Sequence, residues 1–140
     1  AGLGAKGSAW EAAAAAAKGD AAAAKGSGRF QAIVTCFFID TCDDLFDYFE
    51  AMDNALEEGG VWINLGPLNY KKDVKYKLVW DEIRAVWEGM GYEFLRESQV
   101  HTAYHLPPGV KMYTEQYDAI FTTARKGPRP AGWGLQRTPP

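Results

Sequence analysis

Hydrophobic positions change their spacing several times between residues 30 and 126, and each change predicts an element of structure. Ten mostly apolar residues at 30–39 (FQAIVTCFFI), rich in β-branched and aromatic side chains, are typical of a strand buried on both faces. After Asp40, apolar residues recur at helical spacing and predict an amphipathic helix over 43–57, which Gly59 and Gly60 end. The apolar face of this helix comprises Leu45, Phe49, Met52 and Leu56.

A second strand and a second helix follow. Residues 61–65 (VWINL) predict a short buried strand, and residues 69–77 predict a charged loop. The next apolar positions again have helical spacing, and Gly91 ends them. They are Trp80, Ile83, Val86, Trp87 and Met90.

The last two predicted strands, at 92–100 and 117–124, are joined by a loop that contains Pro and Gly at 107–109. Strands that alternate with helices imply parallel crossovers. A connection without a helix implies instead a closing antiparallel hairpin. The pattern therefore predicts an α/β fold, mainly a parallel sheet with an antiparallel pair at its end.

The two ends of the chain differ in composition from its middle. Residues 1–28 contain 13 Ala and 6 Gly, and are interpreted as a low-complexity leader or insert, with a docked helix as the alternative. Residues 127–140 are rich in Pro and Gly and predict a disordered tail. The expected domain therefore covers residues 29–126.

Charge and cysteine content exclude several classes of function. Residues 29–126 carry 10 Lys and Arg against 16 Asp and Glu, a net charge of −6, which disfavours a nucleic-acid partner. No apolar run approaches the ~18 residues of a membrane span. The two cysteines, Cys36 and Cys42, form neither a disulfide framework nor a zinc signature. We expect no metal and a reduced compartment, the cytoplasm with the nucleus as a second location.

Candidate chemistry lies where the predicted parallel strands end. In open α/β sheets ligands bind beyond the carboxyl ends of the strands, which selects residues 39–41 and 65–70. Asp40 would lie at the rim of a buried strand; the alternatives are a helix N-cap and a carboxylate satisfied by backbone N–H groups. By position alone, Cys36 is interpreted as a core thiol and Tyr117 as a packing residue. The residues alone indicate half of an α/β fold of the nucleotide-binding kind.

Three segments together resemble the carnosine N-methyltransferase family. They are residues 35–41 (TCFFIDT), 56–70 (LEEGGVWINLGPLNY) and 117–126 (YDAIFTTARK). The resemblance implies a class I (Rossmann-like) methyltransferase fold, which uses S-adenosylmethionine to methylate an imidazole nitrogen of carnosine. On this mapping the chain is the C-terminal part of the sheet and lacks its first three strands and the glycine-rich cofactor loop. We therefore expect part of a longer enzyme, or a decayed relative.

The resemblance also implies roles for individual residues. Asp40 stands where the family aspartate binds the substrate imidazole, and is the expected catalytic residue. The other expected site residues are Tyr70, Lys71 and Tyr117 on the substrate side and Cys36 and Phe37 on the cofactor side.

Two positions depart from the family pattern. Lys71 replaces a substrate-contacting histidine, and Glu115 replaces a second pocket tyrosine. A charged lysine cannot accept a hydrogen bond, and the glutamate adds a negative charge. The expected function is N-methylation of carnosine or of a similar small molecule or peptide that contains an imidazole. A non-catalytic interaction module or an inactive fragment is the alternative, and the oligomeric state stays open.

Overall fold

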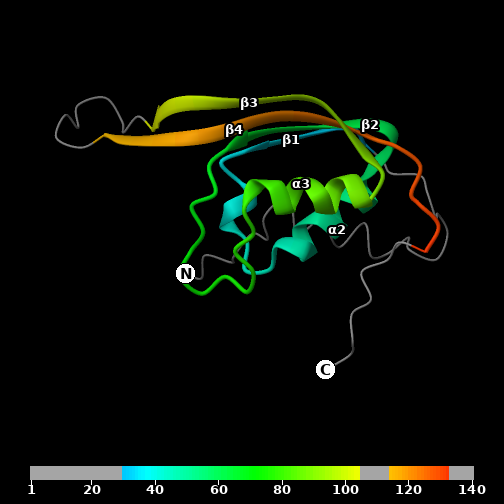
Figure 1. Cartoon of the computed structure of the whole chain (residues 1–140), viewed down its shortest axis with the longest axis horizontal. Helices are drawn as coiled ribbons and strands as arrows, with labels where there is room; N and C mark the ends of the chain where they lie inside the picture. The colour runs from blue at the N-terminus through cyan, green and yellow to red at the C-terminus, as the bar shows by residue number, and fades with distance from the viewer. Residues whose placement is uncertain (1–29, 105–113, 133–140) are drawn as a thin grey trace, which may run out of the picture.

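The structure is a computed structural model that describes residues 30–104 and 114–132. Figure 1 shows the order of its elements along the chain. They are β1 (Phe30–Cys36), the 3-10 turn η1 (Ile39–Thr41), α2 (Leu45–Ala55), β2 (Leu56–Gly66), α3 (Trp80–Gly89), β3 (Tyr92–Tyr104) and β4 (Glu115–Lys126). The predicted Pro/Gly loop at 107–109, the segment 1–28 and residues 133–140 lie outside the described residues.

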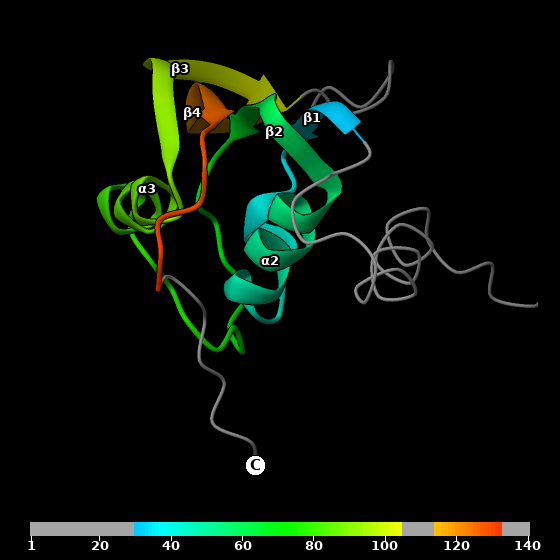
Figure 2. The ribbon, with the colours of Figure 1, turned by 90° about the vertical axis from the view of Figure 1, so that its right-hand side faces the viewer.

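The described strands form one sheet in the order β1-β2-β4-β3. β1 runs parallel to β2, whereas β2 and β3 both pair antiparallel with β4. Helices α2 and α3 lie on the same face of this sheet (Figures 1 and 2). The predicted α/β fold, parallel strands followed by a closing antiparallel pair, is therefore confirmed.

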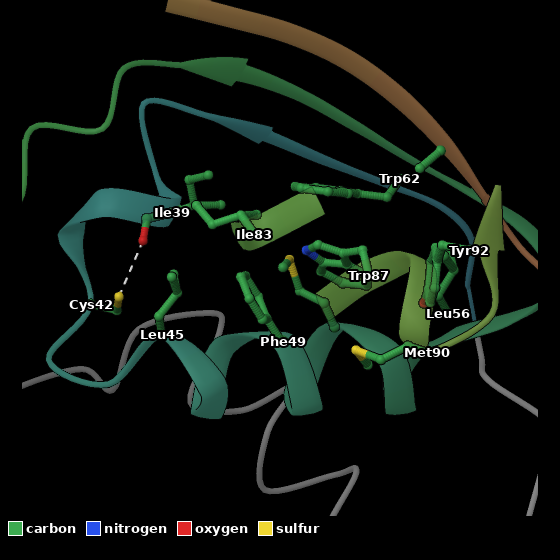
Figure 3. Packing of buried hydrophobic residues seen from close by; sticks show 12 residues of the cluster. Ile39, Cys42, Leu45, Phe49, Leu56, Trp62, Ile83, Trp87, Met90 and Tyr92 are labelled. Carbon is green, nitrogen blue, oxygen red and sulfur yellow. Dashed lines mark hydrogen bonds between the residues drawn. The ribbon is translucent and has the colours of Figure 1, made fainter. Parts of the chain in front are cut away.

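The two helices cover the sheet with an aromatic core. Trp62 of β2 stacks on Trp87 of α3 with ring centroids 4.6 Å apart, and Trp87 also contacts Phe49 of α2 at 5.0 Å. Figure 3 shows these rings between the helices and the sheet. All three side chains are almost completely buried. Because burial of one large apolar side chain contributes roughly 1.5–3 kcal/mol, this cluster holds the helices on the sheet.

Helix α2 begins and ends inside the range that the spacing predicts. Asp44 is its N-cap, since the carboxylate accepts the Phe46 N–H at 3.0 Å. The Thr41 hydroxyl donates to the Phe38 carbonyl at 2.7 Å and does not cap the helix. At the other end Leu56 is already extended, and it starts β2.

The prediction for the first strand is wrong at its carboxyl end and in its burial. β1 stops at Cys36, because Phe37 adopts a left-handed backbone conformation with φ of 49°. The outward side of the strand is open: 68% of Val34 is exposed, and Cys36 is exposed rather than a core thiol. β1 is one of the two edge strands of the described sheet, and its outward face has no helix over it in this part of the chain.

An apolar groove of about 400 Å³ lies between β1 and α2. Its described lining includes Ile33, Val34, Cys36, Phe38, Tyr48 and Met52, and contains no charged side chain.

Neither described α-helix has the length and apolar character that a membrane-spanning segment needs.

Beyond β4, residues 127–132 run back past the start of β3. The Gly127 N–H donates to the Gly91 carbonyl at 3.0 Å, and Arg129 forms an ion pair with the buried Asp53. Gly91 has φ of 93°, and a side chain there would meet the Pro128 carbonyl. A glycine is therefore needed where this segment crosses the chain.

Candidate active site

The candidate site lies where three strand ends meet. β1 ends at Cys36 and β2 ends at Gly66, and these are the carboxyl ends of a parallel pair. β4 runs the other way, and pairs its Ile120 with Gly66, so that Tyr117 near its start reaches the same edge. The edge selected from the sequence as a ligand site is thus formed by residues from β1, β2 and β4.

Phe37 turns the chain out of the sheet at this edge. Its N–H still donates to the Leu65 carbonyl at 2.8 Å, while its φ of 49° ends the strand. The Phe37 ring meets the Tyr117 ring edge-on, with centroids 5.6 Å apart and planes at 80°. Edge-to-face geometry is favourable for aromatic pairs, and here it joins the end of β1 to the start of β4.

Asp40 follows in the 3-10 turn, and its carboxylate contacts the loop after β2. Only 7% of the residue is exposed, and its Oδ2 accepts the Asn69 N–H at 2.9 Å. This backbone contact is one of the alternatives left open by the sequence; the helix N-cap is Asp44 instead. Within the described residues, no Lys, Arg or His nitrogen lies within 4.0 Å of the Asp40 carboxylate.

Tyr70 lies in the loop after β2, close to the Asp40 carboxylate. Its hydroxyl donates to the Leu78 carbonyl at 2.8 Å. Burial, with smaller contributions from Cys42, Asp40 and Glu82, raises the pKa of Tyr70 to about 12. The phenol therefore stays neutral at physiological pH, and its hydroxyl proton is used in the hydrogen bond to the Leu78 carbonyl.

The remaining predicted residues differ in their surroundings. Lys71 is exposed, and it makes no hydrogen bond or ion pair with another described residue. The Tyr117 hydroxyl donates to the Glu115 carboxylate on the same strand. Glu115 lies at a position that departs from the family pattern, and it directly contacts Tyr117, a predicted substrate-binding residue.

Sequence reasoning missed a buried polar network directly behind this edge. Trp62 Nε1 donates to the Thr35 hydroxyl at 2.9 Å, and that hydroxyl donates to Asn64 Oδ1 at 2.9 Å. Asn64 Nδ2 continues the network to the Ile120 carbonyl of β4 at 3.4 Å. The signal in the sequence was a polar residue within each apolar strand, Thr35 in the first and Asn64 in the second. Buried polar groups need such partners, and here they link β1, β2 and β4.

No group of three or more metal-binding side chains is present among the described residues. The geometry offers instead a buried carboxylate, an aromatic pair and an open strand end. The sheet order, with both helices on one face, defines an α/β fold in which a parallel strand pair is followed by an antiparallel pair.

The chain belongs to the carnosine N-methyltransferase family, whose model matches residues 11–128. The matched range starts inside the Ala-rich segment and ends two residues beyond β4. The resemblance that the three sequence segments indicated is thereby confirmed.

Several similar proteins are also named carnosine N-methyltransferase. A carnosine N-methyltransferase of Schizosaccharomyces pombe is 36% identical over 89 residues, which are 54% of this chain and 24% of that protein. The Rattus norvegicus carnosine N-methyltransferase is 30% identical over 99 residues, 67% of this chain and 25% of that protein. Carnosine N-methyltransferase unmet of Drosophila melanogaster is 28% identical over 108 residues, 73% of this chain and 24% of that protein. The chain thus spans about a quarter of the length of these relatives.

One solved structure supports the fold alone. It comes from work on the conversion of a disulfide bond into a thioacetal group during echinomycin biosynthesis, and matches with a TM-score of 0.52. The two sequences are 14% identical, and the match covers 72% of this chain and 50% of that one.

Proposed function

We propose that the natural protein containing this sequence transfers a methyl group from S-adenosylmethionine to an imidazole nitrogen of carnosine or of a similar small molecule or peptide. Membership of the carnosine N-methyltransferase family supports methyl transfer to nitrogen. The single observation that carries the choice of an imidazole is the Asp40 carboxylate. It is buried at the carboxyl edge, anchored through one oxygen, and unpaired with any cation of the described residues.

An imidazole ring suits this carboxylate. Neutral imidazole has one N–H donor and one nitrogen with a free lone pair. Asp40 would accept the N–H through the oxygen that Asn69 does not engage. That contact fixes the tautomer and leaves the lone pair of the other nitrogen available for attack. No proton has to leave before attack, so most of the acceleration comes from holding the reactants in position.

The aromatic residues at the edge would hold the ring. Phe37 and Tyr117 form a corner of two perpendicular rings, a surface on which a flat heterocycle packs. Tyr70 supplies an uncharged aromatic surface near Asp40, and its hydroxyl already donates a hydrogen bond to the Leu78 carbonyl. Together these side chains would orient the imidazole toward the open end of β1.

The residues present fit one wall of a cofactor site. Cys36 is exposed at the end of β1, and it lines the apolar groove together with Phe38 and Tyr48. Such a lining suits the ring portion of an adenosyl group, with Phe37 marking the boundary to the substrate side. When bound, S-adenosylmethionine supplies an electrophilic methyl group on sulfur. The groove lining offers no charge for the methionine portion, which other parts of the protein would hold.

The departures at Lys71 and Glu115 bear on the acceptor. The Glu115 carboxylate accepts a hydrogen bond from the Tyr117 hydroxyl and adds a negative charge to the substrate side of the site. Lys71 adds a positive charge on an exposed loop. Carnosine carries an ammonium group and a carboxylate, as do many peptides that contain histidine. Methyl transfer is therefore more firmly supported than carnosine itself as the acceptor.

The direct test is Asp40→Asn in the whole natural protein. The amide keeps an oxygen for the Asn69 N–H but lacks the negative charge that holds the imidazole N–H. We expect kcat/KM for carnosine to fall by about 10²–10³, a usual range for the loss of a charged group acting at the reacting centre. S-adenosylmethionine binding, followed by calorimetry, should stay within about twofold.

A matched control is Asp73→Asn, which removes the same charge from an exposed position in the loop after β2. Its turnover should equal that of the natural protein. If Asp40→Asn methylates carnosine at the natural rate, Asp40 has no part in the reaction. Cofactor binding without methylation of any imidazole compound would favour the non-catalytic interaction module.

A further inference from the structure

We propose that Gly66 is a positioning residue of this site: its missing side chain allows Phe37 to adopt the backbone conformation that places the Phe37 ring against Tyr117. The inference rests on the proposed function only for the ligand that the site binds. The contact between the two segments is a property of the fold.

The first observation is the conformation of Phe37. Among the described residues it is the only one other than glycine with positive φ, at 49°. A bulky residue in the left-handed region costs of order 1–3 kcal/mol and persists only where its surroundings hold it. The contacts that hold Phe37 include the hydrogen bond to the Leu65 carbonyl, the Tyr117 ring and the close approach of Gly66.

The second observation is the space at Gly66. A Cβ built on Gly66 would lie 3.1 Å from the Phe37 nitrogen and 3.2 Å from the Phe37 Cα. Both are backbone atoms of the strained residue, so a rotamer change cannot relieve the contact. Any side chain at residue 66 must therefore displace the turn that begins at Phe37.

That displacement would reach the proposed catalytic residue. Asp40 lies three residues after Phe37, and Asn69 lies three residues after Gly66. The Asp40–Asn69 hydrogen bond and the Phe37–Gly66 contact thus join the same two segments of chain. A shift of a few tenths of an ångström at Gly66 would move the Phe37 ring and the Asp40 carboxylate together, relative to Tyr117 on β4.

Gly59 provides a matched control in the same strand. Unlike Gly66, it has a left-handed backbone, with φ of 82°, and a Cβ there has no atom within 4 Å. Alanine at residue 59 therefore introduces backbone strain far from the site, without the contact to Phe37. A stability loss shared by both alanine variants is thereby separated from an effect on the site.

The experiment compares Gly66→Ala with Gly59→Ala in the whole natural protein. For Gly66→Ala we expect kcat/KM for carnosine to fall about tenfold, because a misplacement of about 1 Å can cost about 10² in rate and the shift here is smaller. For Gly59→Ala it should stay unchanged. Crystal structures of both variants should show wider separation of the Phe37 and Tyr117 rings only in Gly66→Ala. Unchanged ring separation in Gly66→Ala would overturn the proposal.

A double variant covers the case in which Gly66→Ala folds poorly. Phe37→Gly removes the ring and frees the backbone of residue 37, so it should restore the stability that Gly66→Ala loses. Absence of this rescue contradicts the proposed contact. Failure of the natural protein to bind carnosine would refute the proposed function, while the ring separation and the rescue still decide the role of Gly66.

Discussion

Two buried aspartates at opposite ends of the sheet differ in what surrounds their carboxylates. Asp53 is 1% exposed, and both of its oxygens are engaged. Oδ1 accepts the Tyr92 hydroxyl at 2.9 Å and lies 3.2 Å from Lys126 Nζ, while Oδ2 pairs with Arg129. Asp40, 7% exposed, is engaged by one backbone N–H and by no cation of the described residues.

The difference separates a structural charge from one available to a ligand. A buried carboxylate is costly unless it is paired and hydrogen-bonded, and Asp53 meets that condition within the fold. Asp40 accepts one hydrogen bond within the fold but has no cation beside it among the described residues. A hydrogen-bond donor on a ligand would therefore supply the partner that the carboxylate lacks. A buried ionisable group that the fold leaves incompletely satisfied, at a strand end, is a functional candidate on physical grounds.

The strongest test of this contrast is the same substitution at both positions. Asp53→Asn leaves Lys126 and Arg129 without their anion, and should lower the free energy of unfolding by about 3–5 kcal/mol. Asp40→Asn retains the acceptor for Asn69 and should cost about 1 kcal/mol or less. Urea unfolding of the two variants measures both values. Equal losses would remove the distinction between the two carboxylates.

A smaller effect is expected for Arg129, the more exposed of the two cations on Asp53. Its replacement by Gln should cost about 1 kcal/mol, because Lys126 and Tyr92 remain on the carboxylate. Arg125→Gln, at a neighbouring exposed position, should cost almost nothing. If thermal unfolding shows the same midpoint for both variants, the segment after β4 is not held by Asp53.

The smallest effect is a pH dependence that distinguishes the two tyrosines. Burial raises the pKa of both Tyr70 and Tyr92, and Asp40 adds to the shift at Tyr70 alone. Because the folded-state pKa of Tyr70, about 12, lies above its ordinary value of 10, its contribution to stability is complete below pH 10 and is lost as pH rises toward 12.

Asp40→Asn should therefore lower the pKa of Tyr70 and leave that of Tyr92 unchanged. Ultraviolet titration of the tyrosinate bands measures both, with Tyr70→Phe and Tyr92→Phe to assign them. A Tyr70 titration insensitive to residue 40 would mean that solvent screens the Asp40 carboxylate from Tyr70, against the arrangement proposed for the site.

Much of the fold was predictable because its signals are local. Apolar residues at helical spacing identified α2 and α3, and short apolar runs identified β1 and β2. The end of β1 was not predictable, because nothing in a phenylalanine signals a left-handed turn; the contact with Gly66 permits it. The exposure of Val34 was not predictable either, since an apolar run does not report whether a neighbour covers it.

The site was predictable where it follows strand ends. The rule for parallel sheets selected Asp40 and Tyr70, and the resemblance to the family added Tyr117. The Asp53 cluster was missed, because Asp53 lies on α2 and its partners come from β3, β4 and the segment beyond. The binding and catalytic roles stay predictions for Asp40, Tyr70 and Tyr117, and equally for Lys71, Cys36 and Phe37.

The sequence by itself determined the order of the elements, the family and the residues that reach the carboxyl edge, because periodicity and motifs are written along the chain. Only the tertiary structure decided which buried aspartate is satisfied and which is open, and which strand has an exposed face. Those properties depend on atoms brought together from distant positions, and the strength of a charge interaction depends on the distance between such atoms and on their burial.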